Sequence, residues 1–230
     1  MPGPARADAV VLCSGGLDSC VTLALAARDH AAPAVLHASY GQRTAARERQ
    51  AFERIADFYG IPPERRRVLD LAFLGALGGS ALTDPSIPVP RQEPGPGIPV
   101  TYVPFRNAHL LAAAVSWAEL LGAGTIFIGA VEEDSSGYPD CRESFLAAFE
   151  RAAAEGTGPG FAPRIVAPLV HRAKAEIVRL GVALGAPLEL TWSCYQREDL
   201  ACGECESCRL RLRGFRDAGV ADPIPYASGC

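Results

Sequence analysis

The apolar run Asp8-Ala-Val-Val-Leu-Cys13 is followed at once by the loop Ser14-Gly-Gly-Leu-Asp-Ser19, and this stretch decides the fold. A short apolar run that stops at a Gly-Gly pair predicts a buried strand. From Asp18 to Arg28 the pattern turns helical, with Val21, Leu23 and Leu25 among small residues. The sequence therefore predicts a first strand that passes through a glycine turn directly into a helix.

The same alternation continues along the chain. Strands are expected at 34–39, 67–71, 125–130 and 165–169, and helices at 44–59, 107–121, 142–155 and 174–184. Thr44 is the expected N-cap of the second helix. Strands that alternate with helices favour an α/β fold with a doubly wound, Rossmann-like parallel sheet flanked by helices.

Length and composition set the class of protein. The chain has 230 residues and a net charge of −4. Its composition, with 49% hydrophobic and 21% charged residues, excludes disorder of the whole chain. Apolar stretches stay far below the ~20 residues of a membrane span. The first eight residues contain no apolar signal core, so a cytoplasmic location is expected. The excess of Asp and Glu over Lys and Arg argues against stable nucleic-acid binding.

Residues 78–104 contain the highest density of glycine and proline in the chain. A long connection without regular structure inside a compact domain is usually a lid or a binding loop. A linker between two domains is the alternative. We favour one α/β domain over residues 1–230, in which residues 186–220 form a cysteine-bearing C-terminal lobe.

The Ser14–Ser19 loop has the chemistry of a phosphate site. Backbone N–H groups at a helix N-terminus favour an anion, glycines allow close backbone approach, and the two serines add donors. Asp18 either holds a cation that itself binds phosphate oxygens or caps the helix. The loop is not a Walker A motif, because no Gly-Lys-Ser/Thr follows. A plain turn is the alternative interpretation.

Four cysteines occur within fifteen residues, at Cys194, Cys202, Cys205 and Cys208. Their spacing, C-x7-C-x2-C-x2-C, can close a tetrahedral structural zinc site with no open position. An iron–sulfur cluster is the main rival, but the Cys-Pro that would complete a bacterial ferredoxin run is replaced by Leu212-Arg213. Thiols without metal are the third possibility. We predict one structural Zn²⁺ per chain.

The Ser-Gly-Gly-x-Asp-Ser loop resembles the pyrophosphate loop of the adenine-nucleotide α-hydrolase (PP-loop) superfamily. Those enzymes split ATP to AMP and pyrophosphate while adenylating an oxygen. Further blocks, together with the cysteine segment, resemble one branch, the 7-cyano-7-deazaguanine synthase family. These blocks are Ser39-Tyr-Gly-Gln-Arg43, Ala81-Leu-Thr83, Ser86-Ile-Pro-Val-Pro90, Val103-Pro-Phe-Arg-Asn107, Asp134-Ser-Ser-Gly-Tyr-Pro-Asp-Cys-Arg142 and Lys174-Ala-Glu176. The chain departs from the family at Thr44, Phe105 and Ala173, where the family often has His, Gly and Asp.

The resemblance implies an ATP-dependent ligase of queuosine and 7-deazapurine biosynthesis. Its substrates would be 7-carboxy-7-deazaguanine, ammonia and ATP with Mg²⁺, and its product 7-cyano-7-deazaguanine, reached through an adenylated acid and an amide. It also implies a homodimer with zinc in the C-terminal lobe. The alternatives are a PP-loop tRNA-modifying enzyme of the thiolase or lysidine synthetase type, and a non-catalytic zinc-ribbon binding protein.

Site residues follow from this resemblance and from side-chain chemistry. The expected ATP-binding residues are Cys13, Ser14, Gly15, Gly16, Leu17, Asp18, Ser19, Arg43 and Lys174, and the expected catalytic residues are Asp18, Ser19, Arg106 and Lys174. The expected substrate-binding residues are Tyr102, Phe105, Arg106, Asn107, Glu132 and Asp140.

Each of these side chains also has an ordinary structural interpretation. Arg43 and Arg106 follow the ends of predicted strands, where open α/β sheets bind ligands. The alternative is that each is a solvated surface arginine. Lys174 is at the start of a predicted helix, where the helix dipole disfavours a cation. A nearby anion such as an ATP phosphate would offset this cost. The alternative is a solvated lysine. Asp140 and Glu132, or the adjacent Glu133, would place Mg²⁺ or hold the heterocycle edge. Tyr102 and Phe105 would stack on the heterocycle, although aromatic residues more often lie in the core.

Overall fold

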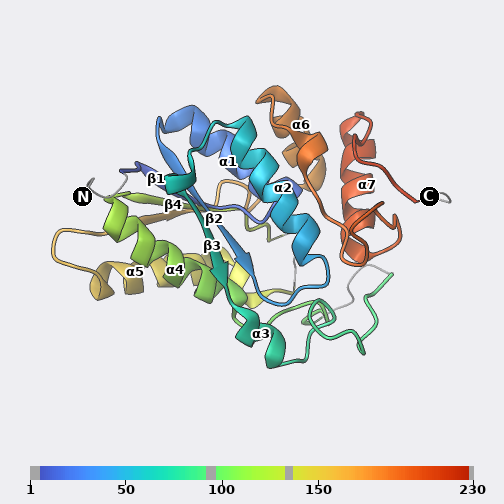
Figure 1. Ribbon diagram of the computed structural model, residues 1–230, viewed down its shortest axis with the longest axis horizontal. Coiled ribbons are helices and arrows are strands. Elements are labelled where there is room, and N and C mark those ends of the chain that lie inside the picture. Colours follow the sequence, from blue (N-terminus) through green and yellow to red (C-terminus); the bar gives the residue numbers. More distant parts are fainter. Residues whose placement is uncertain (1–5, 92–96, 133–136, 228–230) are drawn as a thin grey trace.

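The sheet at the centre of the molecule is parallel throughout and has the strand order β3-β2-β1-β4-β5. The computed structural model describes residues 6–91, 97–132 and 137–227. In this part of the chain the strands are β1 (Ala9–Leu12), β2 (Pro33–Ser39), β3 (Arg66–Asp70), β4 (Thr125–Ile128) and β5 (Arg164–Val166). The predicted α/β fold with a parallel, doubly wound sheet is confirmed (Figure 1).

Helices cover both faces of this sheet (Figure 1). One apolar cluster joins Val11 and Phe127 to α1 (Leu17–Asp29), α2 (Ala45–Phe58) and α6 (Lys174–Ala183). The alternate residues Val10 and Ile126 belong to a second cluster with α4 (Arg106–Leu121) and α5 (Glu143–Gly156). Successive side chains of a strand point to opposite faces, so strands with apolar residues at every position need cover on both sides.

Strand β1 lies at the point where the chain order reverses. Leu12 pairs with Leu36 of β2 on one side and with Ile128 of β4 on the other. In open α/β sheets, ligands bind outside the carboxyl ends of the strands at such a switch point. The Ser14–Ser19 loop begins at this position.

Most element boundaries lie within a few residues of those predicted, and the exceptions have local causes. Helices α3 (Ala72–Ala76) and α7 (Glu206–Ala218) were not predicted. The inner face of α7 carries Arg211, whose charge hides the apolar periodicity. Thr44 occupies the N-cap position of α2, but its predicted capping bond is wrong: Oγ1 donates to Glu48 Oε1 at 2.8 Å.

The Pro-rich segment 78–104 packs on the C-terminal lobe, within its described residues. Glu206 N donates to Pro90 O at 3.1 Å, and the Arg91 guanidinium lies 3.2 Å from the Glu204 carboxylate. Figure 1 shows this green segment beside the start of α7. The described part of the segment is therefore packed against this lobe, and its role as a binding loop stays a prediction. None of the described helices is long and apolar enough to cross a bilayer.

Candidate active site

A cavity of about 260 Å³ opens at the carboxyl ends of β1, β2 and β4. Its wall combines the Ser14–Ser19 loop, the start of α4, the segment 128–131 after β4 and the start of α6. The C-terminal lobe closes the cavity with Trp192, Ser193, Tyr195 and the first turns of α7. Nine of the predicted site residues line it: Cys13, Ser14, Gly16, Leu17, Asp18, Ser19, Arg106, Asn107 and Lys174.

The loop between β1 and α1 is folded on itself by its two serines. Ser19 Oγ accepts the backbone N–H of Ser14 at 3.2 Å and lies 3.1 Å from Ser14 Oγ. Gly15 does not line the cavity; it has φ +89°, and a Cβ there would lie 2.5 Å from the carbonyl oxygen of Glu48. Only glycine fits this position, since the loop is pressed against α2.

The first turn of α1 faces the cavity with unpaired backbone donors. The N–H groups of residues 17–19 precede the first intrahelical bond of α1, which Cys20 N makes to Gly16 O. A Cβ at Gly129 would lie 3.0 Å from Ser19 N, so β4 also approaches this turn closely. The arrangement is an anion site built from backbone amides and the helix dipole.

Asp18 and Lys174 meet at this anion site. Lys174 Nζ lies 2.8 Å and 2.9 Å from the two carboxylate oxygens of Asp18, with side chains 11% and 30% exposed respectively. Asp18 is thus the nearby anion that a lysine at a helix start requires. The ammonium nevertheless remains on the cavity wall, where it can also contact a phosphate.

Arg106 enters the cavity from the start of α4. It donates to Tyr40 Oη at 2.9 Å, and its guanidinium lies 5.1 Å from the centre of that ring. The neighbouring Asn107 holds the segment after β4, because its backbone N–H donates to Asp140 Oδ2 at 2.8 Å. Both bonds fix the first turn of α4 relative to the sheet.

The structure does not bring the predicted acceptors Asp140 and Glu132 to the cavity wall. Asp140 is buried and uses its carboxylate to hold the start of α4, while burial raises its pKa. Glu132 lies 3.9 Å from exposed His171, and Glu133 lies outside the described residues. The carboxylates that line the cavity beside Asp18 are instead Glu48 and Glu206.

Three further predicted residues also lie outside the cavity lining. Arg43 donates to the carbonyl oxygens of Asp84 and Ile87, both at 2.7 Å, and so fastens the Pro-rich segment. Tyr102 accepts the Phe105 N–H at 2.8 Å, and its ring lies 5.5 Å from that of Tyr138. Phe105 is 55% exposed and has φ +58°, in the left-handed region that favours glycine.

Cysteines near the cavity have the character of packed neutral thiols. Burial raises the pKa of both Cys13 and Cys141 to about 11. A thiol with such a pKa is a poor nucleophile near neutral pH. The Cys13 carbonyl oxygen lies 3.2 Å from Nδ1 of His37 in β2.

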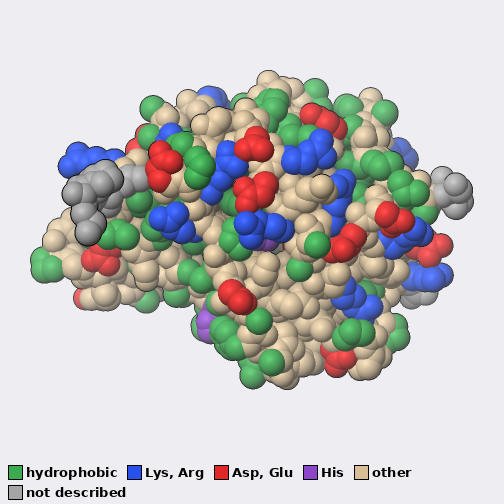
Figure 2. Space-filling model, in the orientation of Figure 1, with side chains coloured by type: hydrophobic (Ala, Val, Ile, Leu, Met, Phe, Trp, Pro, Cys, Tyr) green, Lys and Arg blue, Asp and Glu red, His purple; other side chains and the backbone are tan. Residues whose placement is uncertain are grey.

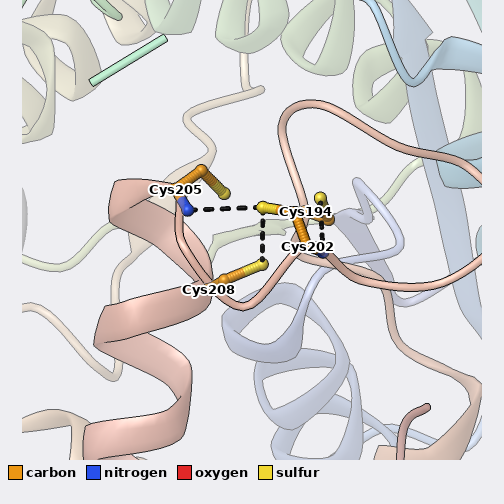
Figure 3. A group of neighbouring side chains, drawn as sticks. All are labelled: Cys194, Cys202, Cys205 and Cys208. Atoms are coloured by element: carbon orange, nitrogen blue, oxygen red, sulfur yellow. Dashed lines mark hydrogen bonds between the residues drawn. The ribbon is translucent and has the colours of Figure 1, made fainter. Parts of the chain in front are cut away.

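The four C-terminal cysteines converge on one point (Figure 3). The Sγ atoms of Cys194, Cys202, Cys205 and Cys208 lie within 4.8 Å of one another. Tetrahedral Zn–S bonds of about 2.3 Å place sulfurs about 3.8 Å apart, so the set fits Zn²⁺ after slight contraction. Backbone N–H groups of Cys202 and Cys205 donate to Cys194 Sγ and Cys202 Sγ at 3.4 and 3.3 Å. Such bonds stabilise thiolates, and the cysteines can hold a metal ion.

Several lining residues were missed by the sequence analysis. The tyrosines at 40, 138 and 195 form an aromatic wall, and Glu48 and Glu206 supply carboxylates. Two of these tyrosines stand inside blocks already quoted for the family, and Glu206 stands inside the cysteine motif. Their position in motifs was the available signal, because nothing in the local periodicity separates them from core residues.

Nearly the whole chain is similar to proteins of one known family. The family model described as queuosine biosynthesis protein QueC matches residues 8–219. A 7-cyano-7-deazaguanine synthase of Koribacter versatilis is 58% identical, over 95% of this chain and 93% of its own. The enzyme of that name from Acidobacterium capsulatum is 56% identical, over 97% and 98%. A third, from Chlorobaculum parvum, is 53% identical over 95% and 96%. With this identity over nearly the whole length, the chain belongs to the QueC family of queuosine biosynthesis proteins.

Proposed function

We propose that this protein is a 7-cyano-7-deazaguanine synthase, an ATP-dependent enzyme that converts 7-carboxy-7-deazaguanine and ammonia to the nitrile. The observation that carries the proposal is its 52–58% identity to synthases of that name, over 93–99% of their length. The cavity supports it, since its lining combines a helix N-terminus suited to an anion, the cations Arg106 and Lys174, and three tyrosines.

The first chemical step activates the carboxylate. A carboxylate oxygen of the substrate attacks the α-phosphorus of ATP, and pyrophosphate leaves. The amides of the Ser14–Ser19 loop and the ammonium of Lys174 stabilise the charge that develops on the leaving group. Asp18 orients Lys174 and would hold the magnesium ion that accompanies ATP. Arg106, positioned by Tyr40, is the cation available to the substrate carboxylate.

The second chemical step forms the amide, and a third and fourth remove its oxygen. Ammonia attacks the acyl carbon, and AMP leaves with the original carboxylate oxygen. The amide oxygen then attacks a second ATP, pyrophosphate leaves, and loss of AMP with two protons from nitrogen gives the nitrile. The chain contains one Ser-Gly-Gly-x-Asp-Ser loop, so one site would serve both activations. Free ammonia is the proposed donor, because no glutaminase signature accompanies the loop.

The four cysteines would hold one Zn²⁺ with a purely structural task. Four thiolates leave no coordination position for a substrate, and the ion would fix the turn that begins α7. We further propose a cytoplasmic homodimer that acts on small molecules. The PP-loop tRNA-modifying alternative is less favoured. On the face shown in Figure 2, basic and acidic side chains are interspersed and no continuous basic surface forms.

The test is a direct conversion assay with the purified zinc-loaded protein. Incubation with 7-carboxy-7-deazaguanine, ammonium and Mg·ATP should yield the nitrile, detected by mass, with AMP and pyrophosphate. Omitting the deazapurine acid should abolish ATP consumption. A non-catalytic zinc-ribbon protein would consume no ATP even when the acid is present. ATP consumption that instead depends on added tRNA would support the tRNA-modifying alternative.

A further inference from the structure

Glu206 lines the cavity although it belongs to the cysteine motif. Glu206 is the first residue of α7, stands between Cys205 and Cys208, and is 6% exposed. Its backbone N–H donates to Pro90 O at 3.1 Å, and the residue is part of the cavity lining. A carboxylate is almost never buried to this degree without partners.

Its partners within the described chain are few. Oε2 accepts one long hydrogen bond from Thr101 Oγ1 at 3.4 Å, and Thr101 in turn accepts from Tyr138 Oη at 2.7 Å. No other side-chain hydrogen bond or ion pair of Glu206 is found in the part of the chain that the structure describes. A nearly buried carboxylate is therefore left with spare acceptor capacity, on a residue that lines the cavity.

The other carboxylates of the cavity wall have a protein partner on each oxygen. Asp18 is paired with Lys174 through both oxygens. Glu48 accepts from Thr44 Oγ1 at 2.8 Å and from Gln42 Nε2 at 3.1 Å, one bond to each oxygen. Among the described lining residues, Glu206 is thus the acid with an oxygen free for a ligand donor.

A 7-deazaguanine presents the complementary group. Its N1–H and 2-amino N–H lie side by side and point the same way, which suits the two oxygens of one carboxylate. We propose that Glu206 binds this edge of the heterocycle and so selects a 2-aminopyrimidinone substrate. The tyrosines at 40, 138 and 195 provide the walls for the flat ring. This proposal rests on the proposed function and names the residue that gives it specificity.

The experiment measures binding of 7-cyano-7-deazaguanine to the zinc-loaded protein by calorimetry, and repeats it with the analogue that lacks the 2-amino group. Wild type should bind the guanine-type compound at least about 10-fold more tightly than the analogue. Glu206→Gln should weaken binding of the guanine-type compound about 10- to 100-fold and reduce the discrimination to below about threefold. The affinity for a non-hydrolysable ATP analogue and the zinc content should not change.

Glu204→Gln is the matched control. Glu204 lies in the same cysteine turn, but it is exposed and paired with Arg91. Its loss should leave both affinities at the wild-type level. Glu206→Asp is the second variant if Glu206→Gln lowers the zinc content. It keeps the negative charge but shortens the side chain by one methylene, and it should still weaken binding of the guanine-type compound.

Two results separate the failure of this proposal from the failure of the function. If wild type binds and converts the deazaguanine acid while the Glu206 variants keep its affinity and discrimination, the assignment of Glu206 is overturned. If wild type neither binds nor converts any 7-deazaguanine, the proposed function itself is wrong, and the assignment of Glu206 is lost with it.

Discussion

The ammonium of Lys174 contacts both carboxylate oxygens of Asp18, a residue 156 positions earlier in the chain. The pair joins the first turn of α6 to the first turn of α1 at the cavity wall. A lysine in the first turn of a helix is opposed by the dipole, and the Asp18 carboxylate offsets this cost. The Ser14–Ser19 loop therefore has a side-chain partner from the C-terminal third of the chain.

Replacement of Asp18 by Asn should lower turnover by orders of magnitude and leave the fold intact. The change removes the anion that positions Lys174, and the lost transition-state stabilisation should be several kcal/mol, roughly 3–4. Steady-state kinetics and thermal unfolding check this, with Asp29→Asn at the exposed end of the same helix as control. Activity within about a factor of three of wild type would reduce Asp18 to a helix-capping role.

Synthetic 7-amido-7-deazaguanine should be converted to the nitrile with ATP and without ammonia. The amide oxygen must be activated by one ATP in the single loop that the chain provides. Mass detection of the nitrile with about one AMP formed per nitrile checks this stoichiometry. An inert amide, in a preparation that still converts the acid, would exclude the single-site amide route.

Replacement of Cys205 by Ser should lower zinc content and thermal stability together. Binding of a structural metal contributes directly to the folding free energy, and Cys205 is buried in the cluster. Metal analysis and thermal unfolding provide the measurement. Cys20→Ala, which alters a buried cysteine in α1 outside the cluster, should keep the full zinc content. Unchanged zinc content in Cys205→Ser would remove Cys205 from the ligand set.

The free energy of unfolding should decrease as the pH falls from about 6.5 to 4 because of His37. Burial lowers the pKa of this imidazole to about 4, whereas the unfolded chain titrates near 6.5. Between these two pKa values the imidazole is protonated in the unfolded chain but not in the folded protein. This difference lowers the free energy of unfolding by up to about 3 kcal/mol. Urea unfolding across this range should show a shallower pH dependence for His37→Gln. Equal slopes would assign the acid sensitivity to other groups.

Replacement of Ala173 by Asp should stabilise the protein by about 1 kcal/mol. Ala173 is the N-cap of α6 and has no side-chain acceptor, so that only the Glu176 carboxylate caps this end, through the Ala173 N–H at 2.9 Å. Asp would accept a further N–H of the first turn. Chemical denaturation should show a higher free energy of unfolding for Ala173→Asp than for wild type. The control Ala173→Val adds bulk without a hydrogen-bond acceptor and should not raise the free energy of unfolding.

The sequence was sufficient for features that depend on local pattern. Spacing and composition were enough to predict the strand–loop–helix unit at 8–28 and a cluster of four cysteines that can hold a metal ion, and the structure places both as expected. Helix α7 was missed because buried Arg211 occupies a core position, where it pairs with Asp222 at 2.8 Å. A charge that is satisfied by tertiary contacts cannot be distinguished in the sequence from a solvated one.

The carboxylates of the site could not be assigned for a related reason. Asp140 and Glu206 are both acids in or near quoted motifs, yet one holds α4 and the other lines the cavity. Their tasks depend on which backbone N–H groups lie within reach, and that is set by packing of segments far apart in sequence. Residue type and spacing predict that a carboxylate is needed but do not predict which one faces the ligand.

The central position of β1 has a consequence for synthesis of the protein on the ribosome. Its partner β2 follows after a single helix, but its other partner, β4, ends only at Ile128. At about 5–20 residues per second, the second edge of this apolar strand stays open on the order of ten seconds. Such an open edge invites pairing with another nascent chain, so the early half of this protein should depend on chaperone protection until β4 has emerged.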